Sequence, residues 1–305
     1  MTSVAGTAAP RYRSGVASRA RTFVGRHALT VYALLAIGYL LLPIAVVVLF
    51  SFNAPKGRFN YVWQGFTLDN WVEWDSVLGL RQAVVMSLEI ATLATVVATA
   101  LGTLMALAIV RHRFWGRGTT NLLVFLPMST PEIVLGASLL TLFLNASTLF
   151  DLGFWTIFIA HVMFIVSYVV VTVKARLIGF DRHLEEAAMD LGANEWTTFR
   201  KVTFPLLAPA ILSAALLGFA ISIDDFVITY LVSGPDQTFP VFVWGISRVT
   251  VPPQVNVVAS AIFLAALLLA LAAVLYQRLA PAVADVGLIR ALHGGGPRRE
   301  MKGTP

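Results

Sequence analysis

The chain contains no cysteine among its 305 residues, so disulfides and thiolate metal sites are excluded. Charged residues are also scarce, at 12% of the sequence, whereas a soluble domain carries about 25%. Hydrophobic residues instead make up 58% of the chain. This balance indicates an integral membrane protein.

Lysine is rare as well, and none of the four lysines follows a glycine. They follow Pro55, Val173, Arg200 and Met301. A P-loop needs a Gly-Lys-Ser/Thr sequence to hold nucleotide phosphates. The chain is therefore not a P-loop ATPase. If ATP drives the activity of this protein, another subunit must hydrolyse it.

Long runs of apolar residues make up most of the sequence. A helix crosses the hydrocarbon core with about 20 apolar residues, and in lipid it satisfies its own backbone polar groups. The period-2 alternation of a membrane barrel is absent. The sequence therefore predicts an all-α membrane protein with six transmembrane helices, at about 29–50, 84–110, 120–144, 153–173, 207–231 and 255–277.

The basic residues are distributed unevenly between the two predicted sides of the membrane. Of the 22 lysines and arginines, 18 fall in the two terminal tails and in the loops after the second and fourth spans. Positive charge marks the cytoplasmic side, so both termini are expected there. The net charge of +6 then reflects topology, and we expect no nucleic-acid partner. The predicted divisions are a cytoplasmic tail at 1–28, a six-span domain at 29–280 and a second cytoplasmic tail at 281–305.

One cytoplasmic segment, residues 181–206, is polar between apolar spans. Good helix formers run from Glu185 to Leu191, and Gly192 accepts the left-handed conformation that ends a helix. Asn194 is suited to cap a second short helix, and Pro205 is tolerated in the first turn of the next span. The predicted product is a helix, a tight turn and a helix. These features alone fit an amphipathic loop on the membrane surface equally well.

The spacing within this segment resembles the EAA signature of ABC-importer permeases. Glu186-Ala187-Ala188 is followed after three residues by Gly192, and nine residues later by Val202, Thr203, Phe204 and Pro205. Val202 and Phe204 depart from the family's Ile and Leu, but both remain apolar. The resemblance implies the type I ABC-importer permease fold, with a cytoplasmic coupling helix that fits a cleft in an ATPase dimer. On this interpretation the partner ATPases bind ATP and Mg²⁺, this chain holds no cofactor, and the coupling residues are Glu185, Glu186, Ala187, Ala188, Leu191, Gly192 and Pro205.

The predicted spans contain four carboxylates and essentially no basic residue. Charge in a membrane is costly, so we treat each carboxylate as a candidate functional residue. Carboxylates without lysine or arginine among them favour a cationic substrate. Prolines interrupt the helix around Glu132, and the adjacent Asp224 and Asp225 would point about 100° apart on a helix. One of the two aspartates is expected on the substrate path, and the other solvated, paired or capping a break. Alternatively, such carboxylates reach water or stay protonated. The predicted substrate-path residues are Asp224, Asp225, Glu132 and Glu89.

Two stretches, residues 127–140 and 221–260, resemble the spermidine/putrescine permeases, specifically the second of their two unlike permease subunits. The resemblance covers about residues 28–280. It implies a transport subunit, not an enzyme, that moves polyamines inward across the bacterial cytoplasmic membrane by alternating access. It also implies a second related permease and an extracytoplasmic substrate-binding protein as partners.

Other functions remain open from sequence. An ABC permease for another small solute would show the same coupling signature. A proton-coupled secondary transporter also carries intramembrane carboxylates, although no convincing internal repeat is visible. An aspartyl intramembrane protease needs two carboxylates from separate helices, which the spacing of Glu132 and Asp225 allows. His161, the one histidine of the fourth span, is expected to be a packed or hydrogen-bonded helix residue.

Overall fold

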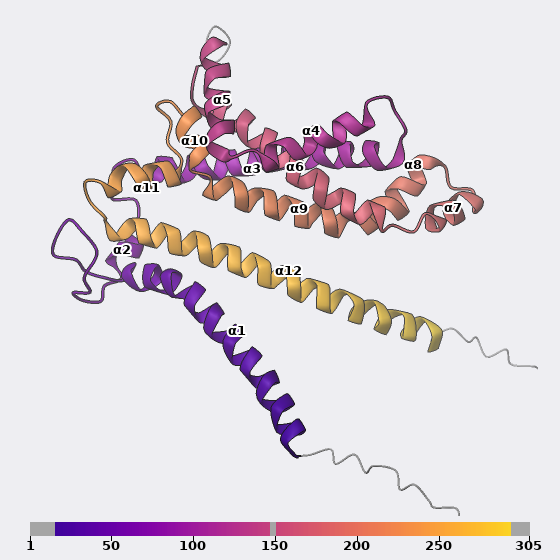
Figure 1. The fold of residues 1–305 in the computed structure, drawn as a ribbon, viewed down its shortest axis with the longest axis horizontal. Helices are drawn as coiled ribbons and strands as arrows, with labels where there is room; N and C mark the ends of the chain where they lie inside the picture. Colours follow the sequence, from indigo (N-terminus) through magenta and orange to yellow (C-terminus); the bar gives the residue numbers. More distant parts are fainter. Residues whose placement is uncertain (1–15, 147–150, 294–305) are drawn as a thin grey trace, which may run out of the picture.

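The structure is a computed structural model, which describes residues 16–146 and 151–293. Three long helices, α3 (Leu80–Arg111), α6 (Phe154–Ile178) and α9 (Phe204–Asp224), pack side by side into a central bundle (Figure 1). Small residues let the backbones approach closely, as is usual in membrane helices. A Cβ on Gly102 of α3 would lie 2.7 Å from Val169 of α6, and one on Gly218 of α9 would lie 2.6 Å from Ile165.

The third predicted span is a bent pair of helices, α4 (Arg117–Ser129) and α5 (Glu132–Asn145). Their axes differ by 107° across a break at Thr130 and Pro131. Thr130 has extended dihedrals because the residue before a proline is disfavoured in the helical region. Helix α5 therefore rises away from the bundle (Figure 1), where it packs against α10 (Val227–Val232).

Four helical stretches within the described residues are long and apolar enough to cross a membrane by themselves. They are Ala28–Phe50, Leu80–Arg111, Phe154–Ile178 and Glu195–Asp224, and the bent pair makes a fifth span if it is counted as one. In α12 (Pro253–His293), the apolar part with described side chains is shorter, at Pro253–Leu269. The predicted limits of the fifth span, 207–231, are wrong, because α9 ends at Asp224 and Asp225 adopts an extended ψ of 122°.

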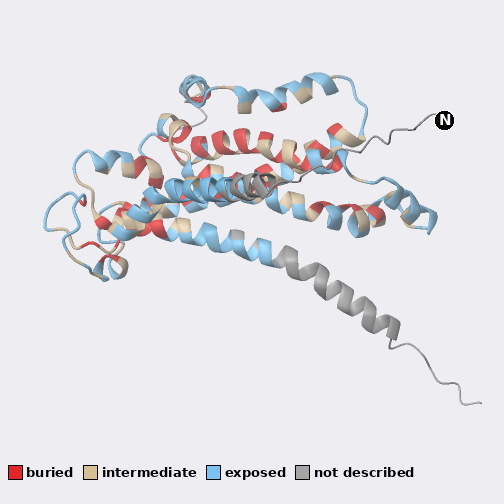
Figure 2. Ribbon diagram, turned by 60° about the horizontal axis from the view of Figure 1, so that its bottom comes forward, coloured by how far each residue is buried: buried red, intermediate tan, exposed pale blue. Residues whose placement is uncertain are grey.

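Helices α1 (Val16–Phe50) and α12 diverge from the central bundle (Figure 1). The spanning part of α1 is exposed almost throughout its length within this chain (Figure 2). Helical backbone extends past the predicted divisions at 28 and 280, since α1 begins at Val16 and α12 continues to His293. The rest of the two predicted tails, 1–15 and 294–305, lies outside the described residues.

The segment between α1 and α3 is organised by buried asparagines. Asn53 donates to the side chain of Asn60 at 2.6 Å, and Asn70 donates to the backbone oxygen of Asn53 at 2.8 Å. This segment, with α2 (Asp69–Val72) and α11 (Phe239–Ser247), lies at one end of the bundle, and α7 (His183–Asp190) and α8 (Glu195–Thr198) lie at the other (Figure 1). The fold thus separates two ends that are connected by continuous helices.

Candidate transport site and coupling segment

A cavity of about 100 Å³ lies where the two broken spans meet. It is lined from α4, α5, α6 and α9 and from the start of α10, and it brings together Glu132, Asp224 and Asp225. Among the described residues that line this cavity, none is a lysine or arginine. Tyr168 and Phe164 contribute aromatic rings to its wall. Three of the four predicted carboxylates therefore converge, although they come from segments far apart in the sequence.

Each helix break presents its carboxylates differently. Glu132 is exposed and lies in the first turn of α5, where a negative charge is favourable against the helix dipole. Asp224 is the last residue of α9 and is also exposed. Asp225 lies within the break, and its side chain is only 6% exposed.

Asp225 is held within the protein by contacts with α10. One carboxylate oxygen accepts the backbone N–H of Thr229 at 2.8 Å and the hydroxyl of Thr229 at 2.7 Å. A carboxylate in this position satisfies donors that the start of a helix leaves free. Asp225 is thus the aspartate that is paired at the helix break, as expected of one of the two. The placement of Asp224 on a substrate path stays a prediction.

His161 of α6 connects the two sides of the break. Its Nδ1 lies 2.7 Å from the hydroxyl of Ser222 and its Nε2 lies 2.9 Å from the hydroxyl of Thr229. Because Thr229 donates its single hydroxyl proton to Asp225, Nε2 carries a proton and donates to Thr229. The ring is buried, with 1% of its surface exposed. The expectation of a packed, hydrogen-bonded histidine is confirmed, but its connection to Asp225 had no sequence signal.

Glu89, the fourth predicted path residue, lies elsewhere. It is exposed on α3, in an open groove with Arg81 and Gln82. The structure does not bring Glu89 to the cavity that holds the other three carboxylates.

Residues 181–206, called the coupling segment from here on, form the predicted helix, turn and helix. Helix α7 is followed by Gly192 at φ +89°, a left-handed conformation that glycine adopts without a steric penalty. The side chain of Asn194 then accepts the backbone N–H of Thr197 at 2.8 Å and caps α8. The predicted short second helix is not separate, however, because α8 continues through the π-helix η1 (Phe199–Thr203) into α9. Pro205 therefore lies inside one long helix, where the wide π-helical turn accommodates a residue that lacks an N–H.

The predicted coupling residues differ in exposure. Glu186, Ala187, Gly192 and Pro205 are exposed, and Leu191 is exposed over 90% of its surface. Ala188 is half-buried. Large exposed apolar side chains next to a polar helix are typical of a surface that another protein covers.

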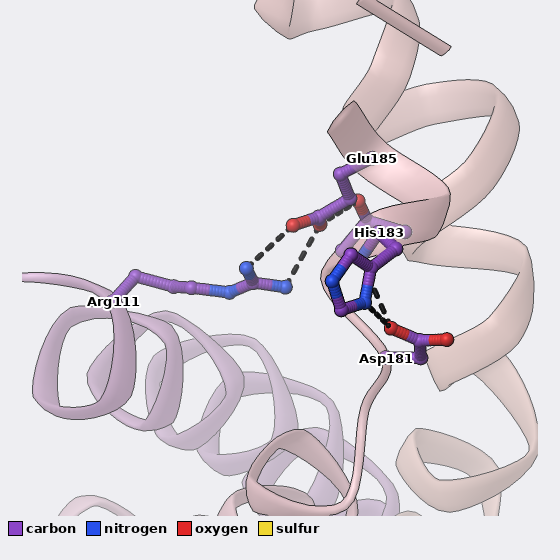
Figure 3. A network of polar contacts seen from close by, with 5 residues as sticks. Arg111, Asp181, His183 and Glu185 are labelled. Atoms are coloured by element: carbon purple, nitrogen blue, oxygen red, sulfur yellow. Dashed lines mark hydrogen bonds and ion pairs between the residues drawn. The ribbon is translucent and has the colours of Figure 1, made fainter. Parts of the chain in front are cut away.

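Glu185 is also half-buried, because its carboxylate turns inward (Figure 3). Its Oε2 lies 2.5 Å from Nη1 of Arg111, and its Oε1 lies 2.8 Å from Nη2. The hydroxyl of Thr203 donates to the same carboxylate. Sequence reasoning counted Arg111 only as a charge on the cytoplasmic side, and nothing local in the sequence indicates this partner.

A second, exposed pair lies at the start of α7, between its first residue, His183, and Asp181 just before it. The Nδ1 of His183 lies 2.7 Å from a carboxylate oxygen of Asp181 (Figure 3). This hydrogen bond raises the pKa of His183 above its usual value, and it lowers the pKa of Asp181. Both side chains are well exposed, so water screens the pair.

A helical membrane bundle with a cavity lined by three carboxylates and an exposed polar helical turn at one end has the features of a solute permease. Residues 98–285 match the family model described as "Binding-protein-dependent transport system inner membrane component". The chain belongs to this family, and so is a membrane component of an ABC importer, a transport subunit rather than an enzyme.

Relatives and solved structures agree with this family. The chain is 38% identical to the spermidine/putrescine transport system permease protein PotC of Escherichia coli K12, over 79% of this chain and 90% of that protein. It is also 38% identical to the putrescine transport system permease protein PotI of the same strain, over 76% of this chain and 84% of that protein.

The structural matches are more distant. A bacterial ABC transporter involved in alginate import superposes with a TM-score of 0.62 at 16% identity, covering 85% of this chain and 98% of that one. An amino acid ABC transporter superposes with a TM-score of 0.53 at 17% identity, covering 70% of this chain and 99% of that one. The predicted fold class, an all-α ABC-importer permease, is confirmed.

Proposed function

We propose that this chain moves polyamines, spermidine or putrescine, into the cytoplasm by alternating access. The observation that carries the proposal is the cavity at the two helix breaks, which combines Glu132, Asp224 and Asp225 without a basic residue among its described lining. The relatives named for spermidine and putrescine transport support the same substrate class.

The cavity suits the chemistry of a flexible polycation. Carboxylates at Glu132 and Asp224 would pair with ammonium groups, and the Tyr168 ring offers a face to a cation. At an effective dielectric constant of about 20, a charge pair about 4 Å apart gains about 4 kcal/mol. Leu135 and Ile221 provide apolar contact for the methylene chain between the ammonium groups.

The cavity has to widen for this substrate. Its volume of about 100 Å³ is below the roughly 300–1,000 Å³ of typical small-molecule sites. The breaks at Pro131 and Asp225 are the natural points of movement, because there the helices already lack continuous backbone hydrogen bonding. Alternating access would then open this space to one side of the membrane at a time.

The proposal includes the assembly around the chain. Residues 181–206 would contact a cytoplasmic ATPase dimer that binds ATP and Mg²⁺, through Glu186, Ala187, Leu191 and Gly192. A second related permease would complete the path, and an extracytoplasmic binding protein would deliver the substrate. Both termini would face the cytoplasm of a bacterial cell, as the distribution of lysine and arginine predicts.

The test is transport by the complete assembly in proteoliposomes. Putrescine or spermidine should stimulate ATP hydrolysis and be taken up, whereas neutral and anionic solutes should do neither. Glu132→Gln and Asp224→Asn should each raise the KM for the polyamine about tenfold or more, because each removes a charge-assisted contact. Glu89→Gln is the matched control, and its KM should stay at the wild-type value. Stimulation by another class of solute, with no response to polyamines, would overturn the substrate assignment.

A further inference from the structure

We propose that Arg111, Glu185 and Thr203 form a clamp that makes the coupling segment move as one body with α3 and α9. In this clamp, Arg111 and Glu185 are positioning residues for transport. The inference rests on the proposed function of α7 as the ATPase contact. It adds a route by which movement of α7 reaches the cavity at the opposite end of α9.

The clamp joins three elements through a single carboxylate. Arg111 is the last residue of α3, Glu185 lies in the first turn of α7, and Thr203 is the last residue of η1, directly before α9. Arg111 binds both oxygens of Glu185, at 2.5 and 2.8 Å (Figure 3). The Thr203 hydroxyl donates to Oε1, which also accepts from Arg111.

This ion pair differs from an ordinary surface pair, which contributes little because the side chains are mobile and solvated. The side chains of Arg111 and Glu185 are only 18% and 15% exposed. The guanidinium also lies over the ring of Phe180, 5.3 Å from its centre. A bidentate arginine–carboxylate pair with a further hydrogen bond fixes both side chains in one geometry.

The backbone connections of α7 to its neighbouring helices are more flexible than the clamp. A short linker, 179–182, joins α7 to α6, and a turn at Gly192 joins it to α8. Either connection can absorb a change in direction of α7 by rotating about backbone bonds. The clamp bypasses both, because it ties α7 directly to the ends of two helices that pack together along the bundle.

Helix α9 gives the clamp access to the transport site. It runs without interruption from Phe204, directly after Thr203, to Asp224, which lines the acidic cavity (Figure 1). A rigid element that spans two sites transmits displacement between them, provided that both ends are held. The clamp holds the cytoplasmic end, and without it α7 would follow the ATPases while α9 stays in place.

The experiment measures how many ATP molecules are hydrolysed per polyamine imported by the complete assembly in proteoliposomes. Glu185→Gln and Arg111→Gln should each raise this ratio at least about fivefold, the lower end of typical coupling between sites. ATP hydrolysis itself should continue, because α7 still docks. The double exchange Arg111→Glu with Glu185→Arg should restore most of the coupling. The matched control is Arg113→Gln, which changes an exposed arginine just after α3, outside residues 181–206.

A separate variant distinguishes failure of the clamp from failure of the proposed function. Glu186→Lys changes the exposed neighbour of Glu185 on α7. If Glu186→Lys uncouples transport while Glu185→Gln and Arg111→Gln keep the wild-type ratio, the clamp is refuted and the coupling role of α7 stands. If Glu186→Lys also leaves ATP-driven uptake unchanged, the proposed coupling role itself is wrong.

The absence of native cysteine permits a second test that does not depend on charge. Arg111→Cys with Glu185→Cys removes the clamp and allows a short thiol-reactive cross-linker to replace it. Cross-linking should lower the raised ATP-to-polyamine ratio of this double variant toward the wild-type value. This measurement also decides the question if either glutamine variant fails to assemble. A cross-linked protein that stays uncoupled would refute the clamp.

Discussion

His161→Leu is the substitution that most directly tests the organisation of the transport site. Leucine places an apolar side chain at this buried position and removes both ring nitrogens. Ser222 then loses its partner from α6, whereas Thr229 loses the donor Nε2 but keeps its bonds to Asp225. The change therefore removes the hydrogen bonds through which His161 joins α6 to both sides of the break in the fifth span, while the bond from Thr156 of α6 to Val232 of α10 remains.

The size of the effect follows from the two hydrogen bonds that are lost. Hydrogen bonds between membrane helices contribute about 0.6 kcal/mol on average and up to about 1.7 kcal/mol, so the pair contributes about 1–3 kcal/mol. We expect the unfolding free energy of the assembled permease to fall by this amount. If the break also shifts, the KM for the polyamine should rise about tenfold, which corresponds to about 1.4 kcal/mol.

The assay combines unfolding of the assembly in lipid nanodiscs with uptake kinetics in proteoliposomes. His161→Gln, which can still donate and accept, should recover part of the loss. Thr172→Val is a matched control, because the Thr172 hydroxyl donates only within α6, to the carbonyl of Tyr168. Wild-type stability and KM in His161→Leu would refute the reasoning, as would strictly additive effects of His161→Leu and Ser222→Ala in a double-mutant cycle.

Three further outcomes follow from the structure. Gly192→Ala forces a side chain into a left-handed conformation at a cost of about 1–2 kcal/mol, and co-purification should show weaker retention of the ATPase. Gly102→Ala brings a Cβ against α6 and should lower the unfolding free energy by about 1–3 kcal/mol, whereas Gly118→Ala, which meets open space, should change it by less than about 0.5 kcal/mol. Asp181→Asn should lower the pKa of His183 in an NMR titration, because the hydrogen bond between the two side chains is the largest cause of the raised pKa. Protonated His183 stabilises the folded protein below its usual pKa, and this contribution is lost as the pH rises through the raised pKa. An unchanged titration in Asp181→Asn, or equal stability of the two alanine variants, would contradict these expectations.

Much of the architecture could be predicted because it depends on local properties of the chain. The length of an apolar run determines whether a helix can cross the membrane, and the charges beside it indicate its orientation. The turn at Gly192 and the cap at Asn194 were also predictable, since each depends on the conformation of a few adjacent residues. By contrast, the continuity of α8 with α9 was not expected, because the π-helix that accommodates Pro205 has no distinct sequence pattern.

The sequence by itself therefore determined the all-helical membrane class, the polar segment 181–206 and the presence of carboxylates with essentially no lysine or arginine in the spans. Tertiary structure alone decided which of these groups meet. Arg111 and Glu185 are 74 positions apart, and His161 is 61 positions from Ser222. Helices that are apolar on every side carry no periodic signal of which face turns inward. The pairing of their few polar groups is decided only when packing removes other partners, since a buried polar group must find one within the protein.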